Sequence, residues 1–235
     1  TIPTWWPFSR VVLSSFVNWM FVTTGCNLRF PHLLSDWLVS LNSSKLTTST
    51  HLTCRTVRVQ HNPVRDPFFR VIANWVRLRT LKLKGNSYLQ CLGSDDRLLT
   101  NHFSTLGALT ALTELDMRGV LPLFTRWVLP TQLQVLDLSS NGIPMSLATQ
   151  TLGPLLSRMT DLRSLGMNEC QLDDVTFAKL TPSLLNCTQL TCLQLSNNSF
   201  RNKTVDLLIA CFTQLHVLHL AYCGLEDDHI ARLVN

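Results

Sequence analysis

A nine-residue pattern recurs along this chain and constrains its fold more than any other feature. Its first, fourth and sixth positions are apolar, and its ninth is usually Asn or Cys. The clearest copies are LQVLDLSSN (133–141), LRSLGMNEC (162–170), LTCLQLSNN (190–198) and LHVLHLAYC (215–223), and the weaker ones are CRTVRVQHN (54–62), LRTLKLKGN (78–86) and LTELDMRGV (112–120). Such self-similarity at a period of about 20–50 residues indicates a solenoid, in which each unit stacks on the next.

The spacing within each copy predicts a short strand with one buried face. Apolar residues at the fourth and sixth positions, as in Leu136 and Leu138, follow the two-residue period of a strand. The ninth position lies in a turn inside the stack, where backbone groups need partners. Asn141 and Asn198 can supply them through a carboxamide, whereas Cys170 and Cys223 can donate only weakly.

The order Asn, Cys, Asn, Cys at the ninth position, with steps of 29, 28 and 25 residues between first leucines, resembles the ribonuclease-inhibitor class of leucine-rich repeat. The resemblance is strong over 133–235 and fair over 54–132. It implies an α/β solenoid with a curved parallel sheet on the concave face and helices on the convex face. The connecting segments agree, because apolar residues recur three and four apart along one helical stripe that should face the sheet. These are Phe177, Leu180 and Leu184, then Val205, Leu208 and Phe212, then Ile230 and Leu233.

The copy at 112–120 is irregular. Val120 stands where Asn or Cys is expected, and the neighbouring segments carry an insertion (88–111) and a shortened return (121–132). We interpret this as an irregular turn of one solenoid spanning 51–235, with about seven repeats.

Residues 1–50 are predicted to form a helical cap or anchor. FPHLLSDWLVSL (30–41) has the three/four spacing of an amphipathic helix, and a solenoid needs its first turn covered. The run also resembles the opening of an F-box, but it lacks the acidic residue after proline and too few residues follow for the rest of that module. Trp5, Trp6 and Trp19 are candidate anchors in a protein interface. The apolar stretch 11–22 would span only about 18 Å as a helix, so no transmembrane span is expected.

The eight cysteines indicate a reduced, intracellular protein, because several fill repeat positions and none form a paired framework. No cysteine and histidine spacing completes a zinc set, so no metal is predicted. The chain begins at Thr1 and its pI is about 8.9, which leaves removal of an organellar presequence open. Mitochondrion and cytoplasm are the expected compartments.

Side chains at the third, fifth and seventh positions of each copy should form rows across the concave face, since neighbouring strands lie about 4.8 Å apart. These rows begin basic, become acidic in the middle and end small and neutral. The candidate partner-binding residues are Arg58, Lys82, Lys84, Glu114, Asp116, Arg118, Asp137, Asn168, Gln194, His219 and Tyr222.

Charge is distributed unevenly along the chain. Residues 1–100 hold 12 Lys and Arg against 4 Asp and Glu, and residues 101–235 hold 8 against 11. Eight basic residues fall between 55 and 84 against the single acid Asp66. This patch would attract RNA phosphates, an acidic protein or an anionic membrane, or it is a solvated flank.

No enzyme signature is present, and no cofactor or small-molecule substrate is predicted. The sequence contains no phosphate-binding glycine loop, GxSxG elbow or HExxH motif. Cys192 and His219 should lie on adjacent strands but two places apart in register, and Gln194 is the one nearby group that could orient them.

The sequence therefore predicts a non-enzymatic scaffold for protein–protein interaction, acting as a structural or recognition subunit of a larger assembly. The absence of a polar capping repeat after Asn235 would fit a partner that covers this end, or a chain that continues. Two alternatives remain open: a ribonucleoprotein component that contacts RNA through residues 55–84, and the ligand-reading part of an adaptor or receptor.

Overall fold

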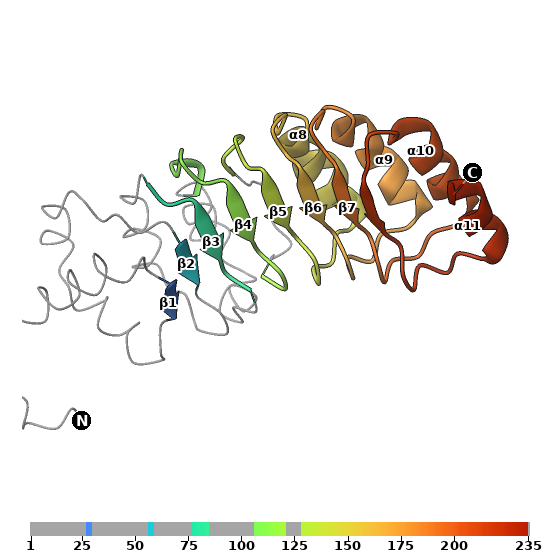
Figure 1. Ribbon diagram of the computed structural model, residues 1–235, viewed down its shortest axis with the longest axis horizontal. Helices are drawn as coiled ribbons and strands as arrows, with labels where there is room; N and C mark the ends of the chain where they lie inside the picture. Colours follow the sequence, from blue (N-terminus) through green and yellow to red (C-terminus); the bar gives the residue numbers. More distant parts are fainter. Residues whose placement is uncertain (1–26, 30–55, 59–76, 85–105, 121–127, 235) are drawn as a thin grey trace, which may run out of the picture.

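The computed structural model describes residues 27–29, 56–58, 77–84, 106–120 and 128–234, which form a solenoid built on one parallel sheet (Figure 1). Eight strands follow one another in chain order, each paired with the next. They are β1 (Asn27–Arg29), β2 (Thr56–Arg58), β3 (Thr80–Lys82), β4 (Glu114–Asp116), β5 (Val135–Asp137), β6 (Ser164–Gly166), β7 (Cys192–Gln194) and β8 (Val217–His219). Strands β2 to β8 occupy the third to fifth positions of the seven sequence copies, so the predicted leucine-rich-repeat solenoid is confirmed.

Strand β1 is an element that the repeat pattern did not reveal. It lies within residues 1–50, the segment expected to be a helical cap, and Leu28 pairs in register with Val57 of β2. The surrounding residues lack the full nine-residue pattern, which is why the sequence did not predict this strand. The predicted helix 30–41, the apolar stretch 11–22 and the three candidate anchor tryptophans lie outside the described residues.

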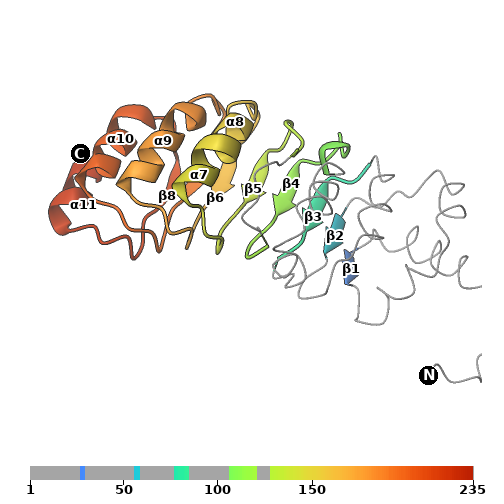
Figure 2. The same cartoon turned by 180° about the vertical axis from the view of Figure 1, so that it is seen from behind.

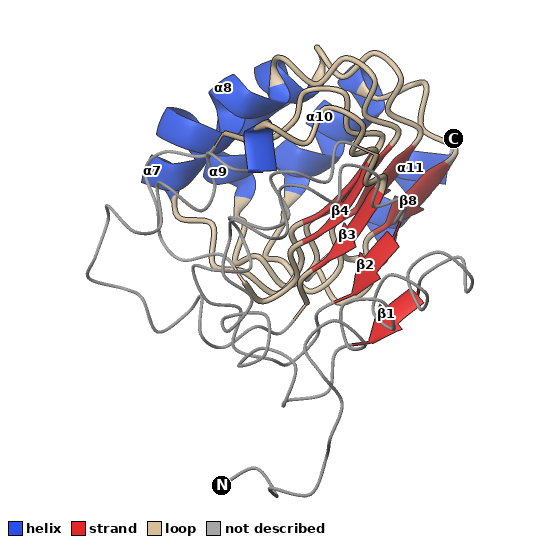
Figure 3. Ribbon diagram, turned by 90° about the vertical axis from the view of Figure 1, so that its left-hand side faces the viewer, coloured by secondary structure: helices blue, strands red, loops and turns tan. Residues whose placement is uncertain are grey.

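Helices cover one face of the sheet over its C-terminal half, as the views from behind and from the end show (Figures 2 and 3). They are α7 (Met145–Leu147), the π-helical turn η1 (Ala148–Leu152), α8 (Gly153–Leu156), α9 (Asp174–Leu184), α10 (Asn202–Cys211) and α11 (Asp227–Val234). Helix α9 begins at a side-chain cap, because Asp173 accepts a hydrogen bond from the Thr176 amide at 2.7 Å. Asp174 in turn accepts from the Arg201 amide and the Thr204 hydroxyl, which joins the start of α9 to the start of α10.

Leucine ladders between the sheet and the helices form the core. The fourth-position residues of β3 to β7 have no exposed surface, and the first and sixth positions of these copies are buried as completely. The fourth-position ladder runs Leu81, Leu115, Leu136, Leu165 and Leu193. Phe177 of α9 adds ring contacts to Phe200 and Phe212, with centroids 5.6 and 6.2 Å apart. Burial of this apolar surface is the main favourable term in stacking the repeats.

The ninth position stabilises the turns as predicted. The Asn198 amide nitrogen donates to the carbonyls of Met167 and Leu195, and its oxygen accepts from the amides of Cys170 and Leu172. Asn141 donates to equivalent carbonyls in its own turn and in the preceding repeat. The thiols of Cys170 and Cys223 also donate to buried carbonyls, at 3.3 and 3.1 Å.

Two helical segments differ from the simple expectation. Between β5 and β6 the helix is interrupted, because the Gly153 amide bonds to Ala148, five residues back, in a π-helical turn. In α11, Leu233 packs against the core as predicted, whereas Ile230 keeps 43% of its surface exposed. None of the helices in the described ranges is long and apolar enough to span a lipid bilayer.

Candidate functional site

The candidate site is the face of the sheet opposite the helices, which carries the third, fifth and seventh positions and which we call the concave face. Parallel pairing brings equivalent positions into line, for example Lys82 with Asp116, and Asp137 with Gly166. The repeat pattern therefore determines which side chains are neighbours, and the predicted rows exist from β3 to β8. From β3 to β7 these rows rest on a fully buried leucine ladder, so their backbone is held rigidly there.

The first pair of charges joins β3 to β4. The Lys82 ammonium lies 2.6 Å from one Glu114 carboxylate oxygen, and the Thr80 hydroxyl donates to the other at 3.2 Å. Lys82 and Glu114 keep 25% and 33% of their side-chain surface exposed. The last basic residue of the fifth-position row, Lys82, and the first acidic residue of the third-position row, Glu114, thus neutralise each other.

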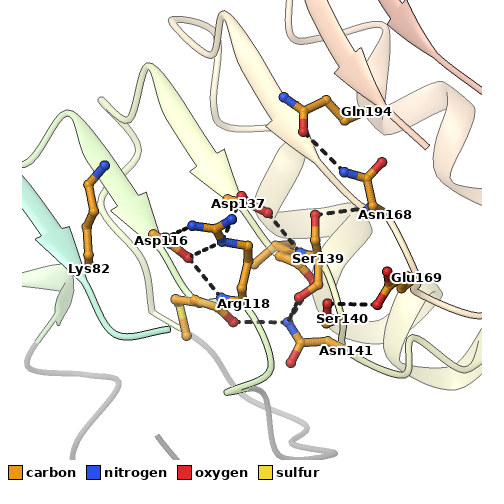
Figure 4. Close-up of polar contacts among 12 residues, drawn as sticks. Lys82, Asp116, Arg118, Asp137, Ser139, Ser140, Asn141, Asn168, Glu169 and Gln194 are labelled. Carbon is orange, nitrogen blue, oxygen red and sulfur yellow. Dashed lines mark hydrogen bonds and ion pairs between the residues drawn. The ribbon is translucent and has the colours of Figure 1, made fainter. Parts of the chain in front are cut away.

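Arg118 forms the centre of the charged half of the concave face (Figure 4). Its guanidinium contacts the buried carboxylate of Asp116 at 2.6 and 3.0 Å, and its Nε lies 3.2 Å from the Asp137 carboxylate on the next strand. These carboxylates raise the pKa of Arg118, chiefly through the hydrogen bond with Asp116. The seventh-position side chain of one strand is therefore clamped between two fifth-position acids.

Gly166 provides room for the Asp137 carboxylate. A Cβ atom at Gly166 would lie 2.5 Å from Asp137 Oδ1 and 3.1 Å from the Ser139 hydroxyl. The same carboxylate oxygen accepts a hydrogen bond from the Ser139 amide at 3.0 Å. The missing side chain at Gly166 thus lets Asp137 reach across toward β6 while it also contacts Arg118.

Amides and hydroxyls replace charges over β6 to β8. The Asn168 side-chain amide donates to the side-chain oxygen of Gln194 at 3.2 Å (Figure 4). The Asn168 side-chain oxygen accepts from the Ser196 backbone amide at 2.8 Å. The Ser139 hydroxyl accepts from the Asn168 amide at 3.1 Å, and in a later repeat the Ser196 hydroxyl accepts from the Ala221 amide in the same way. Sequence reasoning did not select these two serines as site residues, although both lie in the seventh-position row.

The remaining predicted residues are scattered. His219 is exposed on β8 and Lys84 is half-exposed after β3. Arg58 lies in β2 in register with Lys82, but its side chain is outside the described residues. Tyr222 lies in the turn after β8, one position beyond the seventh-position row, and is 87% exposed.

Chemically reactive groups are not assembled on the described portion of this face. Gln194 pairs with His219 in the sheet, which leaves Cys192 two residues out of register with the histidine, as predicted. Burial raises the pKa of Cys170 to about 12 and that of Cys187 to about 11, so both thiols stay protonated. Within the described ranges no three His, Cys, Asp or Glu side chains are grouped to hold a metal ion.

Solved structures similar to this chain include the following two. One is internalin C2 from Listeria monocytogenes, with 21% identity and a TM-score of 0.45 over 75% of this chain and 66% of that one. The other is a secreted internalin-like protein from Listeria monocytogenes, with 19% identity and a TM-score of 0.47 over 78% of this chain and 56% of that one. The chain thus spans less than two thirds of the length of each. No protein-family model matches the chain.

Proposed function

We propose that this protein is a non-enzymatic recognition subunit that binds another protein through the concave face. The observation that carries the proposal is the set of polar side chains fixed by mutual contacts on a rigid sheet: Lys82 with Glu114, Arg118 with two aspartates, and Asn168 with Gln194. Side chains that are already ordered lose little conformational entropy when a partner binds. A broad polar surface, charged at one end and neutral at the other, suits a macromolecular partner. Small molecules instead bind mostly in concave, largely apolar pockets.

We assign the repeats to the ribonuclease-inhibitor type. One support is the alternation of Asn and Cys at the ninth position, where Asn198 and Cys170 both hydrogen-bond to backbone groups of the buried turns. The other is that the full helices α9 and α10 connect β6 to β7 and β7 to β8. We also propose a reducing compartment, mitochondrion or cytoplasm, because the five cysteines in the described residues are unpaired. Cell fractionation tests the compartment directly.

The function is tested by isolating the protein gently from its native source, sizing the particle that carries it and identifying the co-purifying molecules. Binding to that partner is then measured for a double variant that places two cations on the concave face, Gln194→Arg with His219→Arg. The matched control is Gln189→Arg with His216→Arg, which changes the same residue types at exposed positions that precede β7 and β8. We expect the concave-face variant to lose at least about tenfold in affinity, or ~1.4 kcal/mol, and the control to bind normally. Migration as a monomer, or equal binding by both variants, would contradict the proposal.

A ribonucleoprotein role is the second candidate, based on the basic patch at 55–84. Within the described residues, Arg77 and Arg79 are exposed and Lys84 is half-exposed. Contact with RNA phosphates predicts that Lys84→Glu lowers affinity and flattens the salt dependence of binding, because fewer counter-ions are released. RNA in the isolated particle together with this change in slope would favour the second candidate over the first.

A further inference from the structure

Each of the turns that follow β4 to β8 contains a residue with left-handed backbone geometry. The eighth position has a φ of +60° at Gly119, +58° at Ser140, +55° at Glu169, +57° at Asn197 and +56° at Tyr222. Glycine adopts this conformation without strain and asparagine tolerates it, whereas a bulky side chain is a genuine outlier there. Tyr222 is thus the residue in this row that suits its backbone conformation least.

The exposure of Tyr222 follows from its repeat position. Ser140, Glu169 and Asn197 are also exposed, although a further repeat follows each of them. The eighth position therefore points into solvent in interior repeats too, and Tyr222, at 87% exposed, follows the same rule. Tyr222 neither packs in the core nor favours the backbone conformation of its position. Backbone strain of this kind is a reason to look for a function of the residue.

The concave face beside Tyr222 carries no charge at its third, fifth and seventh positions from β6 to β8. The residues there are Ser164, Gly166, Asn168, Cys192, Gln194, Ser196, Val217, His219 and Ala221. The Asp137 carboxylate that reaches toward β6 is already paired with Arg118. Over β7 and β8, a charged group brought onto this surface would lose water without gaining a counter-ion at these positions, which is costly. Val217, by contrast, is 41% exposed and offers apolar contact.

The amide pair on this surface suits a polypeptide backbone. Gln194 accepts from Asn168, while its own amide nitrogen makes only a weak contact with the Cys192 sulfur at 3.9 Å. That nitrogen is therefore available to a stronger acceptor such as a peptide carbonyl. A carboxamide has the same donor and acceptor groups as a peptide bond, so it can pair with an extended chain.

We propose that Tyr222 is the anchor residue for an uncharged, extended polypeptide segment of a partner protein, which lies over β6 to β8. The phenol ring supplies a large contact area at low entropic cost, as aromatic residues do at the energetic centres of interfaces. The Gln194 side chain orients the partner segment by hydrogen bonding to the backbone of that segment, and Val217 contacts one of its apolar side chains. This inference rests on the proposed recognition function and names the region of the concave face that carries it.

The test uses a random-peptide display library selected on the whole chain, followed by affinity measurements for Tyr222→Asn and for the control Glu169→Asn. Both changes place asparagine at a left-handed eighth position, but only the first removes the ring. We expect selected peptides poor in charged residues, at least about tenfold weaker binding by Tyr222→Asn, and a change within about twofold for the control. Relief of strain should also raise the thermal midpoint of Tyr222→Asn by ~2 °C, so weaker binding would not reflect unfolding.

Other outcomes overturn the inference. Equal binding by Tyr222→Asn and wild type would show that the tyrosine is not part of the site. Selected peptides dominated by Lys and Arg, or by Asp and Glu, would refute an uncharged partner. Binding to an array of neutral oligosaccharides without enrichment of any peptide would refute the polypeptide. If the natively isolated partner still depends on Gln194 and His219 while Tyr222→Asn has no effect, the recognition function stands and the anchor fails.

Discussion

Asn198→Ala should be among the most destabilising single substitutions in the described residues of the chain. The side chain is buried, and its oxygen is the acceptor for the amides of Cys170 and Leu172 in the preceding turn. Its nitrogen also donates to the Met167 carbonyl. Each buried polar group left without a partner costs about 1–3 kcal/mol, so we expect a loss of about 3–5 kcal/mol in the free energy of unfolding. That is a large fraction of the ~5–15 kcal/mol typical of a domain.

The repeat pattern supplies two comparisons for Asn198→Ala. Asn198→Cys keeps a weak donor and replaces the carboxamide oxygen with sulfur, which is only a weak acceptor. It should therefore still cost about 2–4 kcal/mol for the two poorly paired amides. Cys170→Ala removes only a thiol that donates at 3.3 Å, and should cost about 1 kcal/mol. The predicted order of stability is therefore wild type, Cys170→Ala, Asn198→Cys and Asn198→Ala.

Urea unfolding gives the three free energies, and amide hydrogen exchange gives the local effect. The amides of Cys170 and Leu172 should lose protection in both Asn198 variants and keep it in Cys170→Ala. The reasoning is refuted if Asn198→Ala costs no more than Cys170→Ala while both amides remain protected, since the carboxamide would then not be their acceptor.

Three further outcomes can be measured simply. Iodoacetamide at pH 8 should modify half-exposed Cys192 in the folded protein much faster than Cys170, whose pKa of about 12 keeps it protonated; peptide mass spectrometry reads the ratio. Asp173→Ala should remove about 1 kcal/mol of stability at pH 7. The hydrogen bond from the Thr176 amide lowers the pKa of Asp173 in the folded state. The stabilisation by Asp173 is therefore present above its unfolded-state pKa and is lost as pH falls through its folded-state pKa. Urea denaturation of wild type and Asp173→Ala at several pH values measures this loss. Gly166→Ala should displace the Asp137 carboxylate, so a double-mutant cycle with Asp137→Asn should be non-additive by about 0.5–3 kcal/mol.

The repeat architecture was predictable from sequence because one buried side chain repeats at one spacing. Leu136, Leu165 and Leu193 occupy the fourth position of their copies, and each lies at the centre of a strand as expected. The role of Asn198 was predictable for a similar reason, since few side chains can satisfy donors and acceptors together in a buried turn. Strand β1 could not be predicted, because residues 27–29 carry no complete copy of the pattern.

The left-handed eighth position was hidden for a different reason. Gly119, Glu169 and Tyr222 share a backbone angle but no side-chain chemistry, so no pattern of residue types marks the position. The contacts of Arg118 were also hidden. They depend on where a long side chain turns after its strand ends, and on the absence of a Cβ at Gly166 two strands later. The repeat pattern shows which residues are neighbours on the concave face, but it does not show in which direction a long, flexible side chain turns.

The charged side chains that stand out first in the sequence are the least available for binding. Arg118 and Lys82 are held by carboxylates at 2.6 Å, so a partner that recruited either would first have to replace an existing ion pair. Partly exposed pairs of this kind contribute little net energy, and exchanging one carboxylate for another gains little. Over β6 to β8 no such pair must be broken among the described residues, and Gln194 still has a donor engaged only with a distant sulfur. Affinity should therefore depend more on the neutral half of the concave face, and the charged half should act mainly by excluding partners of the wrong charge.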